Sequence, residues 1–344
     1  MKKVLFICVK DSVFYKPVHK ALVDYGLEVY TADWRGNIWL GRKSIIHRIG
    51  EKSPFRGKVR DIGNKIVNRK VLKMASELNP DYVFAMKAKN LELDTLDKLR
   101  ENSITINWYA DVLDNWDTWQ KIVTYYDYMF NYDAYLVDLL NKQGHNHVYQ
   151  LPWAGAISKD SKWENFGKKY NISFIGSYHP ERFPRVDLLK GLKKMGLNIW
   201  GNKAWLKTEL KDCYRGFLEP EPKNIEMIYK KSKIAIYLDS IYDVKCSGIT
   251  LRPFEITSAG TMMLGQVFRD ELFDFFEDGK DFISFEGKED LIKKAEYFLN
   301  NDGMRIQIAR SGFEKVKNKH TYNDRINKMF EIVIHEQAKN GKKN

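Results

Sequence analysis

The chain has 344 residues, of which 44% are hydrophobic, and this length suits two domains better than one. No apolar run is long enough to span a membrane, and the three cysteines include no Cys-x-x-Cys pair, which argues against a disulfide framework or a zinc site. The net charge of +12 points to a negatively charged partner, yet residues 34–73 alone hold twelve basic and two acidic residues. These features predict a cytoplasmic protein with one strongly basic surface.

The first half of the chain alternates short apolar runs with helical patterns, which is typical of a parallel α/β sheet. Gly26 and Gly144 stand where helix C-caps are expected. The sequence therefore predicts a Rossmann-like domain at residues 1–155, with a basic, mostly helical insertion at residues 34–78. Strands are predicted at residues 4–9, 28–32, 82–86, 104–109, 128–131 and 148–151. Helices are predicted at residues 13–25, 91–100, 116–125 and 134–143.

A linker of mixed composition at residues 152–169 precedes a second series of the same kind. The sequence thus predicts a second Rossmann-like domain at residues 170–320, facing the first across a cleft, and a terminal helix at residues 321–344 that crosses back toward the first domain. The predicted strands are residues 172–175, 197–200, 214–218, 234–238, 261–264 and 282–285. The predicted helices are residues 182–195, 224–231, 253–259, 271–276, 289–299 and nearly all of 304–338.

Phosphate-binding residues are expected after the strands of the second series. No Gly-x-Gly-x-x-Gly or Walker loop occurs, which argues against a dinucleotide dehydrogenase or a P-loop kinase. Gly176 and Ser177 lie where a predicted strand turns into a helix, a place that offers backbone N–H groups to an anion. Arg182 and Arg185 follow closely and could add positive charge. The same residues also fit an ordinary Gly-Ser turn with two surface arginines.

A second candidate site lies at the start of the helix predicted at residues 253–259. Pro253 suits the first turn of this helix, and Gly260 suits its end. Arg252 would then stand at the helix start beside a diphosphate, while Glu255, one turn later, could accept hydrogen bonds from a ribose diol. Alternatively, Glu255 only favours the helix dipole and Arg252 forms a surface ion pair.

Residues 172–325 resemble the C-terminal donor domain of GT-B glycosyltransferases, most closely that of the spore-maturation (CgeB-like) family. The most specific element of that family is the run Thr-Leu-Arg-Pro-Phe-Glu-Ile-x-x-Ala-Gly, which occurs here at residues 250–260. The same region is similar to bacteriophage DNA β-glucosyltransferase in its Gly-Ser strand end, its Ile-Thr-Leu-Arg segment and its Gly-Leu-Asn-Ile strand. The resemblance implies a fold of two Rossmann-like domains, an N-terminal acceptor domain and a C-terminal donor domain.

The resemblance also implies a role for each candidate residue. It assigns the donor diphosphate to Arg252 together with Arg182 or Arg185, beside the Gly-Ser strand end. It assigns the donor ribose to Glu255. The nucleobase would be recognised by the backbone around Phe217 and Leu218.

Two features of the sequence bear on the reaction chemistry: a serine where a related family has a glutamate, and the absence of an Asp-x-Asp motif. Ser247 stands where the large retaining family with two glutamates would place its first glutamate, which weakens the case for retention. No Asp-x-Asp motif occurs, so no divalent metal is expected to bridge the diphosphate. Asp111, just after a predicted strand of the first domain, is the candidate general base of an inverting transfer. Asp111 could instead cap the following helix, where Asp114 is also available.

These observations predict a metal-independent, inverting glycosyltransferase that needs no cofactor. Its donor would be a UDP-sugar, with GDP- and dTDP-sugars as further choices, and its acceptor a surface polysaccharide or glycolipid. Two alternatives stay open: a bacteriophage-type DNA glucosyltransferase, with DNA as the partner, and a non-catalytic glycan-binding or scaffold protein.

The basic insertion has its own predicted partner. Apolar residues between positions 38 and 49 interleave with Arg42, Lys43 and Arg48, as expected of a segment that lies on an anionic membrane surface. The sequence therefore predicts peripheral attachment to the inner face of the membrane. A merely solvated helical face would carry the same charge.

Overall fold

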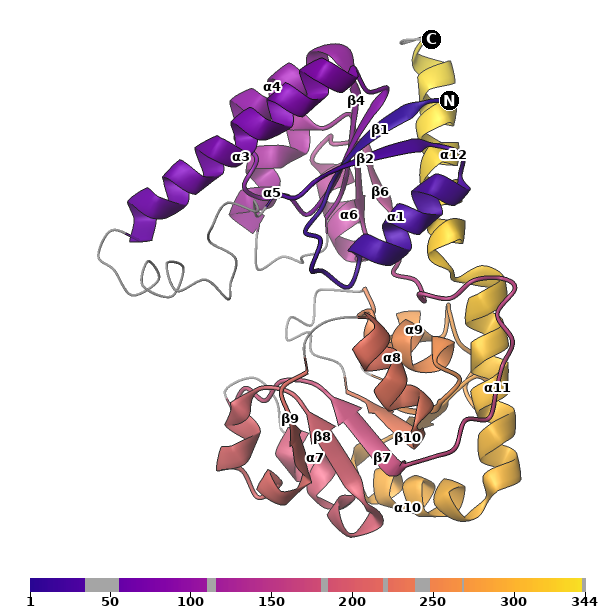
Figure 1. Ribbon diagram of the computed structural model, residues 1–344. Helices are drawn as coiled ribbons and strands as arrows, with labels where there is room; N and C mark the ends of the chain where they lie inside the picture. Colours follow the sequence, from indigo (N-terminus) through magenta and orange to yellow (C-terminus); the bar gives the residue numbers. More distant parts are fainter. Residues whose placement is uncertain are drawn as a thin grey trace. The chain divides into compact units, whose positions relative to one another are not determined.

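The computed structural model describes residues 1–34, 56–109, 116–180, 185–218, 222–238, 248–267 and 269–341 (Figure 1). The chain divides into two compact units. Unit 1 comprises Met1–Leu151 and Ile326–Asn344, and unit 2 comprises Pro152–Arg325. The chain therefore enters unit 2 after Leu151 and returns to unit 1 at Ile326.

Unit 1 contains a six-stranded parallel sheet with the strand order β2-β1-β3-β4-β5-β6. Its strands are β1 (Lys3–Ile7), β2 (Glu28–Ala32), β3 (Tyr82–Met86), β4 (Ile104–Trp108), β5 (Tyr128–Asn131) and β6 (Val148–Gln150). Its helices are α1 (Tyr15–Asp24), α3 (Arg56–Leu78), α4 (Leu93–Asn102), α5 (Trp116–Ile122), α6 (Ala134–Lys142) and most of α12 (Tyr322–Asn340). Each of these strands begins and ends within two residues of its predicted bounds.

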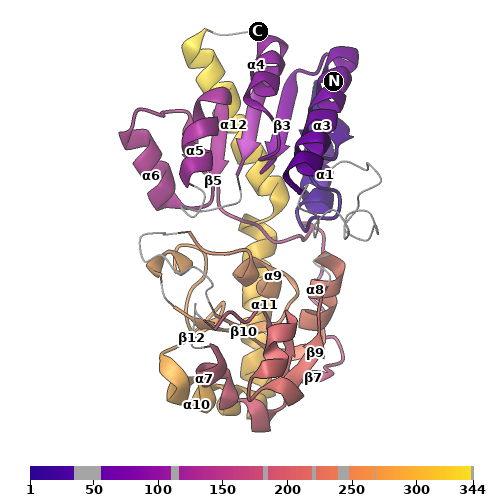
Figure 2. The ribbon, with the colours of Figure 1, turned by 90° about the vertical axis from the view of Figure 1, so that its left-hand side faces the viewer.

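Alternating side chains of the strands cover the two faces of this sheet. Leu5 of β1 belongs to the core that holds α3, α4, α5 and α6. Phe6 points to the other face and stacks on Tyr15 of α1, with the ring centroids 6.1 Å apart. Phe330 of α12 lies on this second face, where it meets the ring of Tyr82 edge-on. The last helix of the chain therefore completes the first unit (Figure 2).

Helix α3 is the described part of the predicted basic insertion. Its inner side is buried through Val67 and Val71. Asn68, also buried, donates from Nδ2 to the carbonyl of Asn90 over 3.0 Å and accepts the N–H of Glu92 at Oδ1 over 2.9 Å. These contacts anchor α3 to the segment after β3. Residues 35–55 of the predicted insertion lie outside the described part of the chain.

Unit 2 contains a second six-stranded parallel sheet, with the order β12-β11-β10-β7-β8-β9. Its strands are β7 (Tyr170–Ile175), β8 (Leu197–Trp200), β9 (Tyr214–Gly216), β10 (Ser232–Tyr237), β11 (Met262–Gln266) and β12 (Ile283–Phe285). Its helices are α7 (Arg185–Lys190), α8 (Pro222–Lys230), α9 (Arg252–Ser258), α10 (Gly287–Asn300) and α11 (Asp302–Lys319). If the six strands are numbered from 1 in chain order, the sheet has the order 6-5-4-1-2-3, which is that of a doubly wound fold. The winding direction reverses between the neighbouring strands β7 and β10.

Two predicted helices of unit 2 are shorter than expected. The helix predicted at residues 182–195 is described as α7 and a 3-10 turn, η3 (Lys193–Met195). Gly191 separates them, and it packs so closely that a Cβ there would lie 2.3 Å from the side chain of Ile292. The helix predicted at residues 271–276 is a 3-10 turn, η6 (Asp270–Leu272), because its backbone hydrogen bonds mostly join residues three apart.

The predicted terminal helix is broken into α11 and α12 at His320 and Thr321. Thr321 and Asp324 form a reciprocal cap at the start of α12. The Thr321 N–H donates to Asp324 Oδ2 over 2.9 Å, and the Asp324 N–H donates to Thr321 Oγ1 over 3.2 Å. Such a cap starts a new helix because it satisfies backbone groups that have no partner within the helix. None of the described helices is both long enough and apolar enough to cross a membrane.

Candidate functional site

The carboxyl ends of the unit 2 strands form the candidate site. In open α/β sheets ligands bind at this edge, beside the two strands where the winding direction reverses. In unit 2 these strands are β7 and β10. Gly176 and Ser177 directly follow β7, Leu218 follows β9, and Arg252 begins the helix that follows β10. The fold therefore gathers these predicted residues at one edge, whereas Arg182 and Asp111 lie outside the described residues.

Arg252 and Glu255 form an ion pair at this edge. Nη1 of Arg252 lies 2.6 Å from Oε2 of Glu255, and the side chains are 28% and 15% exposed. The partner of Arg252 is thus the other candidate residue, and neither side chain is fully solvated. The pair uses one guanidinium nitrogen and one carboxylate oxygen, and each group has further hydrogen-bonding atoms to offer a ligand.

The surroundings set the charge of this pair. Burial raises the pKa of Glu255, and the charge of Arg252 opposes that effect. Burial acts to lower the pKa of Arg252, but the Glu255 carboxylate and the hydroxyls of Tyr229 and Tyr237 together outweigh burial, so the pKa of Arg252 is raised. The hydroxyl of Tyr229, on α8, adjoins Arg252, and burial raises the pKa of this phenol as well. The cluster therefore presents a permanent cation beside a half-buried carboxyl group and a protonated hydroxyl.

The turn after β7 is held by side chains from other elements. Three successive carbonyls accept hydrogen bonds: that of Gly176 from Nε1 of Trp205 (2.8 Å), that of Ser177 from Nη1 of Arg185 (2.5 Å), and that of Tyr178 from Nδ2 of Asn202 (2.9 Å). The Tyr178 N–H also donates to Oδ1 of Asn202 over 3.0 Å. These bonds hold the orientation of the three peptide groups in the turn.

Arg185 is one of the two arginines that the resemblance offers for the diphosphate. It is 5% exposed, and its guanidinium lies 5.6 Å from the ring centroid of Phe174 while it donates to the Ser177 carbonyl. In this structure Arg185 therefore shapes the turn after β7. Leu218 is half-buried and follows the exposed Phe217.

The sequence analysis missed Gly201, Asn202 and Trp205. A Cβ at Gly201 would lie 2.1 Å from the carbonyl oxygen of Gly176, so only glycine allows β7 and β8 to end side by side here. Gly201 and Asn202 directly follow a predicted strand, as Gly176 and Ser177 do. That repeated position is the signal that could have identified them. Among the described residues, no group of three or more His, Cys, Asp or Glu side chains could hold a metal ion.

Residues 184–331 match a protein family described as glycosyl transferase-like. They include α9 with Arg252 and Glu255. The chain is a glycosyltransferase. A search of curated protein sequences finds no significant match.

The glycosyltransferase has the GT-B fold, as solved structures show. Sucrose-phosphate synthase from Thermosynechococcus elongatus is 9% identical, with a TM-score of 0.65 over 98% of this chain and 100% of the other. Anabaena HepE, solved with UDP and glucose, is 10% identical, with a TM-score of 0.61 over 97% and 100%. A Listeria monocytogenes protein described as a UDP-N-acetylglucosamine 2-epimerase is 14% identical, with a TM-score of 0.60 over 100% and 98%. A sucrose-phosphate synthase and a protein described as an epimerase thus share this fold, so the fold alone does not decide the chemistry, and the family match indicates which chemistry applies.

Proposed function

We propose that the chain transfers a sugar from a UDP-sugar to a glycan or lipid-linked acceptor, such as a surface polysaccharide or glycolipid, with inversion at the anomeric carbon. The Arg252–Glu255 ion pair at the reversal point of the unit 2 sheet carries this proposal. An arginine suits a diphosphate and a neighbouring carboxylate suits a ribose diol, so the pair fits two parts of a UDP- or GDP-sugar, whereas the deoxyribose of a dTDP-sugar lacks the diol. Anabaena HepE has the same fold and binds UDP-glucose, which favours uracil as the base.

Each remaining candidate residue has a proposed place in donor binding. The turn at Gly176 and Ser177 would lie beside the diphosphate, although the Gly176 N–H already donates to the Trp200 carbonyl over 2.9 Å. Arg185 acts by holding that turn, and Arg182 adds charge from the following segment. The backbone at Leu218 contacts the base. Unit 1 binds the acceptor.

The leaving diphosphate is proposed to be stabilised without a metal or other cofactor. The sequence has no Asp-x-Asp motif, and the raised pKa of Arg252 keeps its charge permanent at working pH. A fixed cation stabilises the charge that develops on the leaving group as the bond to the sugar breaks. A relation to the CgeB-like family and a cytoplasmic location complete the proposal.

The donor assignment is tested by calorimetry with fragments of the donor. Arg252→Met should lower affinity for UDP about 10- to 100-fold, because a charge-assisted hydrogen bond is lost, and should hardly change affinity for uridine. Glu255→Gln should lower affinity for UDP, yet have little effect on binding of 2′-deoxy-UDP, which lacks one hydroxyl of the diol. Unchanged UDP affinity in both variants would refute the donor assignment.

A second ion pair in unit 2 supplies the control. Arg305 and Asp302 of α11 have the same spacing, with Nη1 and Oδ1 2.7 Å apart. Arg305→Met should lower the melting temperature, because this buried guanidinium also donates to the carbonyl of Phe298. It should leave UDP affinity unchanged. Equal losses of affinity at Arg252 and Arg305 would show that the loss reflects damage to the fold.

Asp111 is proposed as the general base. It follows β4 by three residues along the chain, and carboxyl ends of strands collect catalytic groups. Asp111→Asn should bind UDP-sugar normally but transfer sugar at least about 100-fold more slowly, on the scale of a lost positioned base. Turnover near that of the parent enzyme, or a product that keeps the anomeric configuration of the donor, would exclude this role.

A further inference from the structure

The outer side of α3 combines exposed isoleucines with basic side chains. Ile62 is 60% exposed and Ile66 is 40% exposed, although isoleucine is among the residues most often buried. The inner side of the same helix is occupied by Val67 and Val71. The exposed residues between positions 61 and 77 are Asp61, Ile62, Lys65, Ile66, Arg69, Lys70, Lys73, Ser76 and Glu77.

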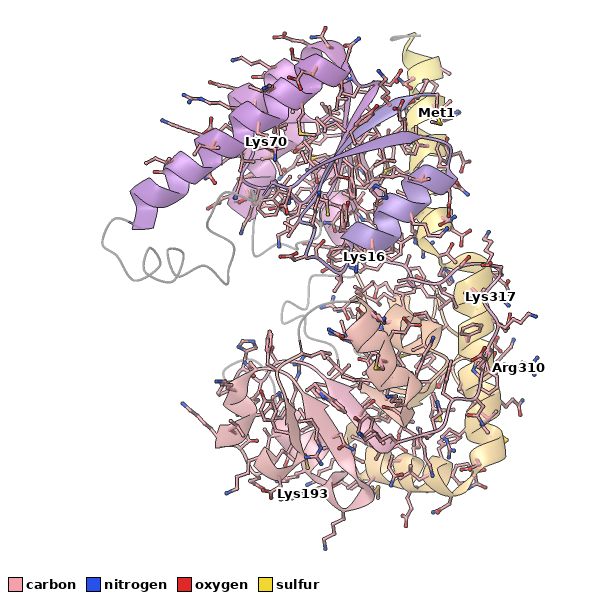
Figure 3. The ribbon with its side chains drawn as sticks, in the orientation of Figure 1. Met1, Lys16, Lys70, Lys193, Arg310 and Lys317 are labelled. Carbon is pink, nitrogen blue, oxygen red and sulfur yellow. The ribbon has the colours of Figure 1, made fainter. Side chains whose placement is uncertain are left out.

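These residues are ordered around the helix axis. Successive residues of an α-helix are about 100° apart, so residues spaced by four, three and four positions lie in one stripe. Ile62, Ile66, Arg69 and Lys73 have this spacing and define the α3 stripe. Lys65 and Lys70, also exposed, border it on either side, and Lys70 is labelled on α3 in Figure 3. Two apolar side chains are thus surrounded by four basic side chains, one of which, Lys73, lies 3.7 Å from Glu77.

We propose that the α3 stripe binds an anionic lipid surface. The isoleucines would enter the boundary between headgroups and acyl chains, while the basic side chains remain at the level of the phosphates. This inference concerns unit 1 and holds whichever donor unit 2 binds. The predicted membrane segment at residues 38–49 lies outside the described residues, so the inference rests on α3.

The composition of the stripe favours lipid over other partners. A nucleic acid would neutralise the positive charges but would leave Ile62 and Ile66 against phosphate and water. A second copy of the chain, paired symmetrically, would bring the same four positive charges face to face. Of these three partners, an anionic bilayer surface is the one that offers both negative charge and an apolar layer within the reach of one helix.

Vesicle sedimentation of the full chain tests the proposal. The chain should sediment with vesicles of phosphatidylcholine and phosphatidylglycerol, but not with phosphatidylcholine alone. Arg69→Glu/Lys73→Glu should weaken binding about 10²- to 10³-fold, since each basic residue near such a surface contributes about fivefold and the change reverses two charges. Ile62→Ser/Ile66→Ser keeps the charge and should still weaken binding at least about tenfold.

Matched variants on the opposite face of the sheet serve as controls. Lys16 and Lys20 of α1 are exposed, and Lys20 pairs with Asp24 at the spacing with which Lys73 pairs with Glu77. Lys16→Glu/Lys20→Glu should therefore change binding far less than the α3 charge reversal. Ile334→Ser on α12, where isoleucine is 49% exposed beside acidic Glu331, should have no effect.

Three outcomes would overturn the proposal. The first is that the parent chain binds neither vesicle, and the second is that both α3 variants bind like the parent. The third is that the chain binds duplex DNA or RNA, loses this binding on charge reversal, and keeps it in Ile62→Ser/Ile66→Ser. That third result would assign the stripe to nucleic acid. Circular dichroism should show that each variant folds, since all the altered side chains are exposed.

Discussion

His320 is a half-buried histidine whose surroundings keep it neutral. Its Nδ1 lies 3.1 Å from Nη2 of Arg325, and because arginine only donates, Nδ1 must accept. The rings of Phe254 and Phe275 lie 5.9 and 5.5 Å from its ring. Burial, then the charges of Arg325 and Lys315, lower the pKa of His320 to about 4. Protonation of this ring would place a cation against an arginine that is itself buried.

Unit 2 should therefore lose stability in mild acid. The pKa of His320 is lower in the folded chain than its ordinary value of 6.5, so the unfolded chain binds the proton first as pH falls. The neutral His320 ring contributes fully to the free energy of unfolding above pH 6.5, and this contribution is lost between pH 6.5 and about 4. At 1.36 kcal/mol per pKa unit, the loss is at most about 3 kcal/mol. Urea unfolding at several pH values should show this loss, and His320→Asn should flatten the profile in that window. Identical profiles for the two proteins would contradict the assignment.

The turn after β7 shows how one element depends on its neighbours. The Gly-Ser pair is visible in the sequence, but its geometry depends on Asn202 and Trp205, which lie after β8. No local pattern predicts these contacts, because the partners are 24 and 29 positions apart. The burial of Arg185 was likewise not predictable from its charge. Its guanidinium can be buried because it donates to the Ser177 carbonyl and lies over the ring of Phe174.

Gly201→Ala tests the close approach of β7 and β8. The added Cβ would meet the backbone oxygen of Gly176 at 2.1 Å, so the two strand ends must move apart. We expect a loss of about 1 to 3 kcal/mol in the free energy of unfolding and weaker UDP binding, because the turn after β7 moves with them. Gly303→Ala in α11 meets no atom within 4 Å and should stabilise the chain by about 0.5 to 1 kcal/mol. Equal effects at the two positions would contradict the strand-end argument.

At the level of the whole molecule, the chain passes between its units twice. The two connecting segments are hydrogen-bonded to each other within unit 2. Arg325, the last residue of unit 2, donates from Nε to the Pro152 carbonyl over 2.9 Å and from Nη2 to the Trp153 carbonyl over 2.9 Å. Gly155 donates its N–H to the His320 carbonyl over 2.9 Å. The segment that enters unit 2 and the segment that leaves it are thus held together. From Ile326 onward α12 belongs to unit 1.

Phe330→Ala should therefore destabilise the N-terminal half of the chain. Phe330 is fully buried, stacking on Tyr25 with centroids 4.7 Å apart and meeting Tyr82 at 5.1 Å. Removing such a ring from a core costs about 3 to 5 kcal/mol. Hydrogen exchange should show lost protection in β1 and β3, while Ile334→Ala, at an exposed position of the same helix, should change little. Loss of protection confined to α12 would show that this helix does not support unit 1.

The sequence alone determined the order and the type of most elements. The period of the apolar residues distinguished strands from helices, and Gly26, Gly144 and Gly260 marked three helix ends, where all three adopt positive φ. It also singled out Arg252 and Glu255, since a charged pair at the start of a predicted helix after a predicted strand is visible locally. These features depend on neighbours within a few positions along the chain, and local patterns record such neighbours faithfully.

Only the tertiary structure decided which residues meet. It placed the hydroxyl of Tyr229 beside Arg252, fixed the turn after β7 with side chains that follow β8, and returned α12 to the sheet of unit 1. It also divided α3 into a buried side and an exposed side, which composition alone could not do. Each of these features depends on packing between segments far apart along the chain. That packing depends on the shape and burial of whole elements, which cannot be predicted from a short stretch of sequence.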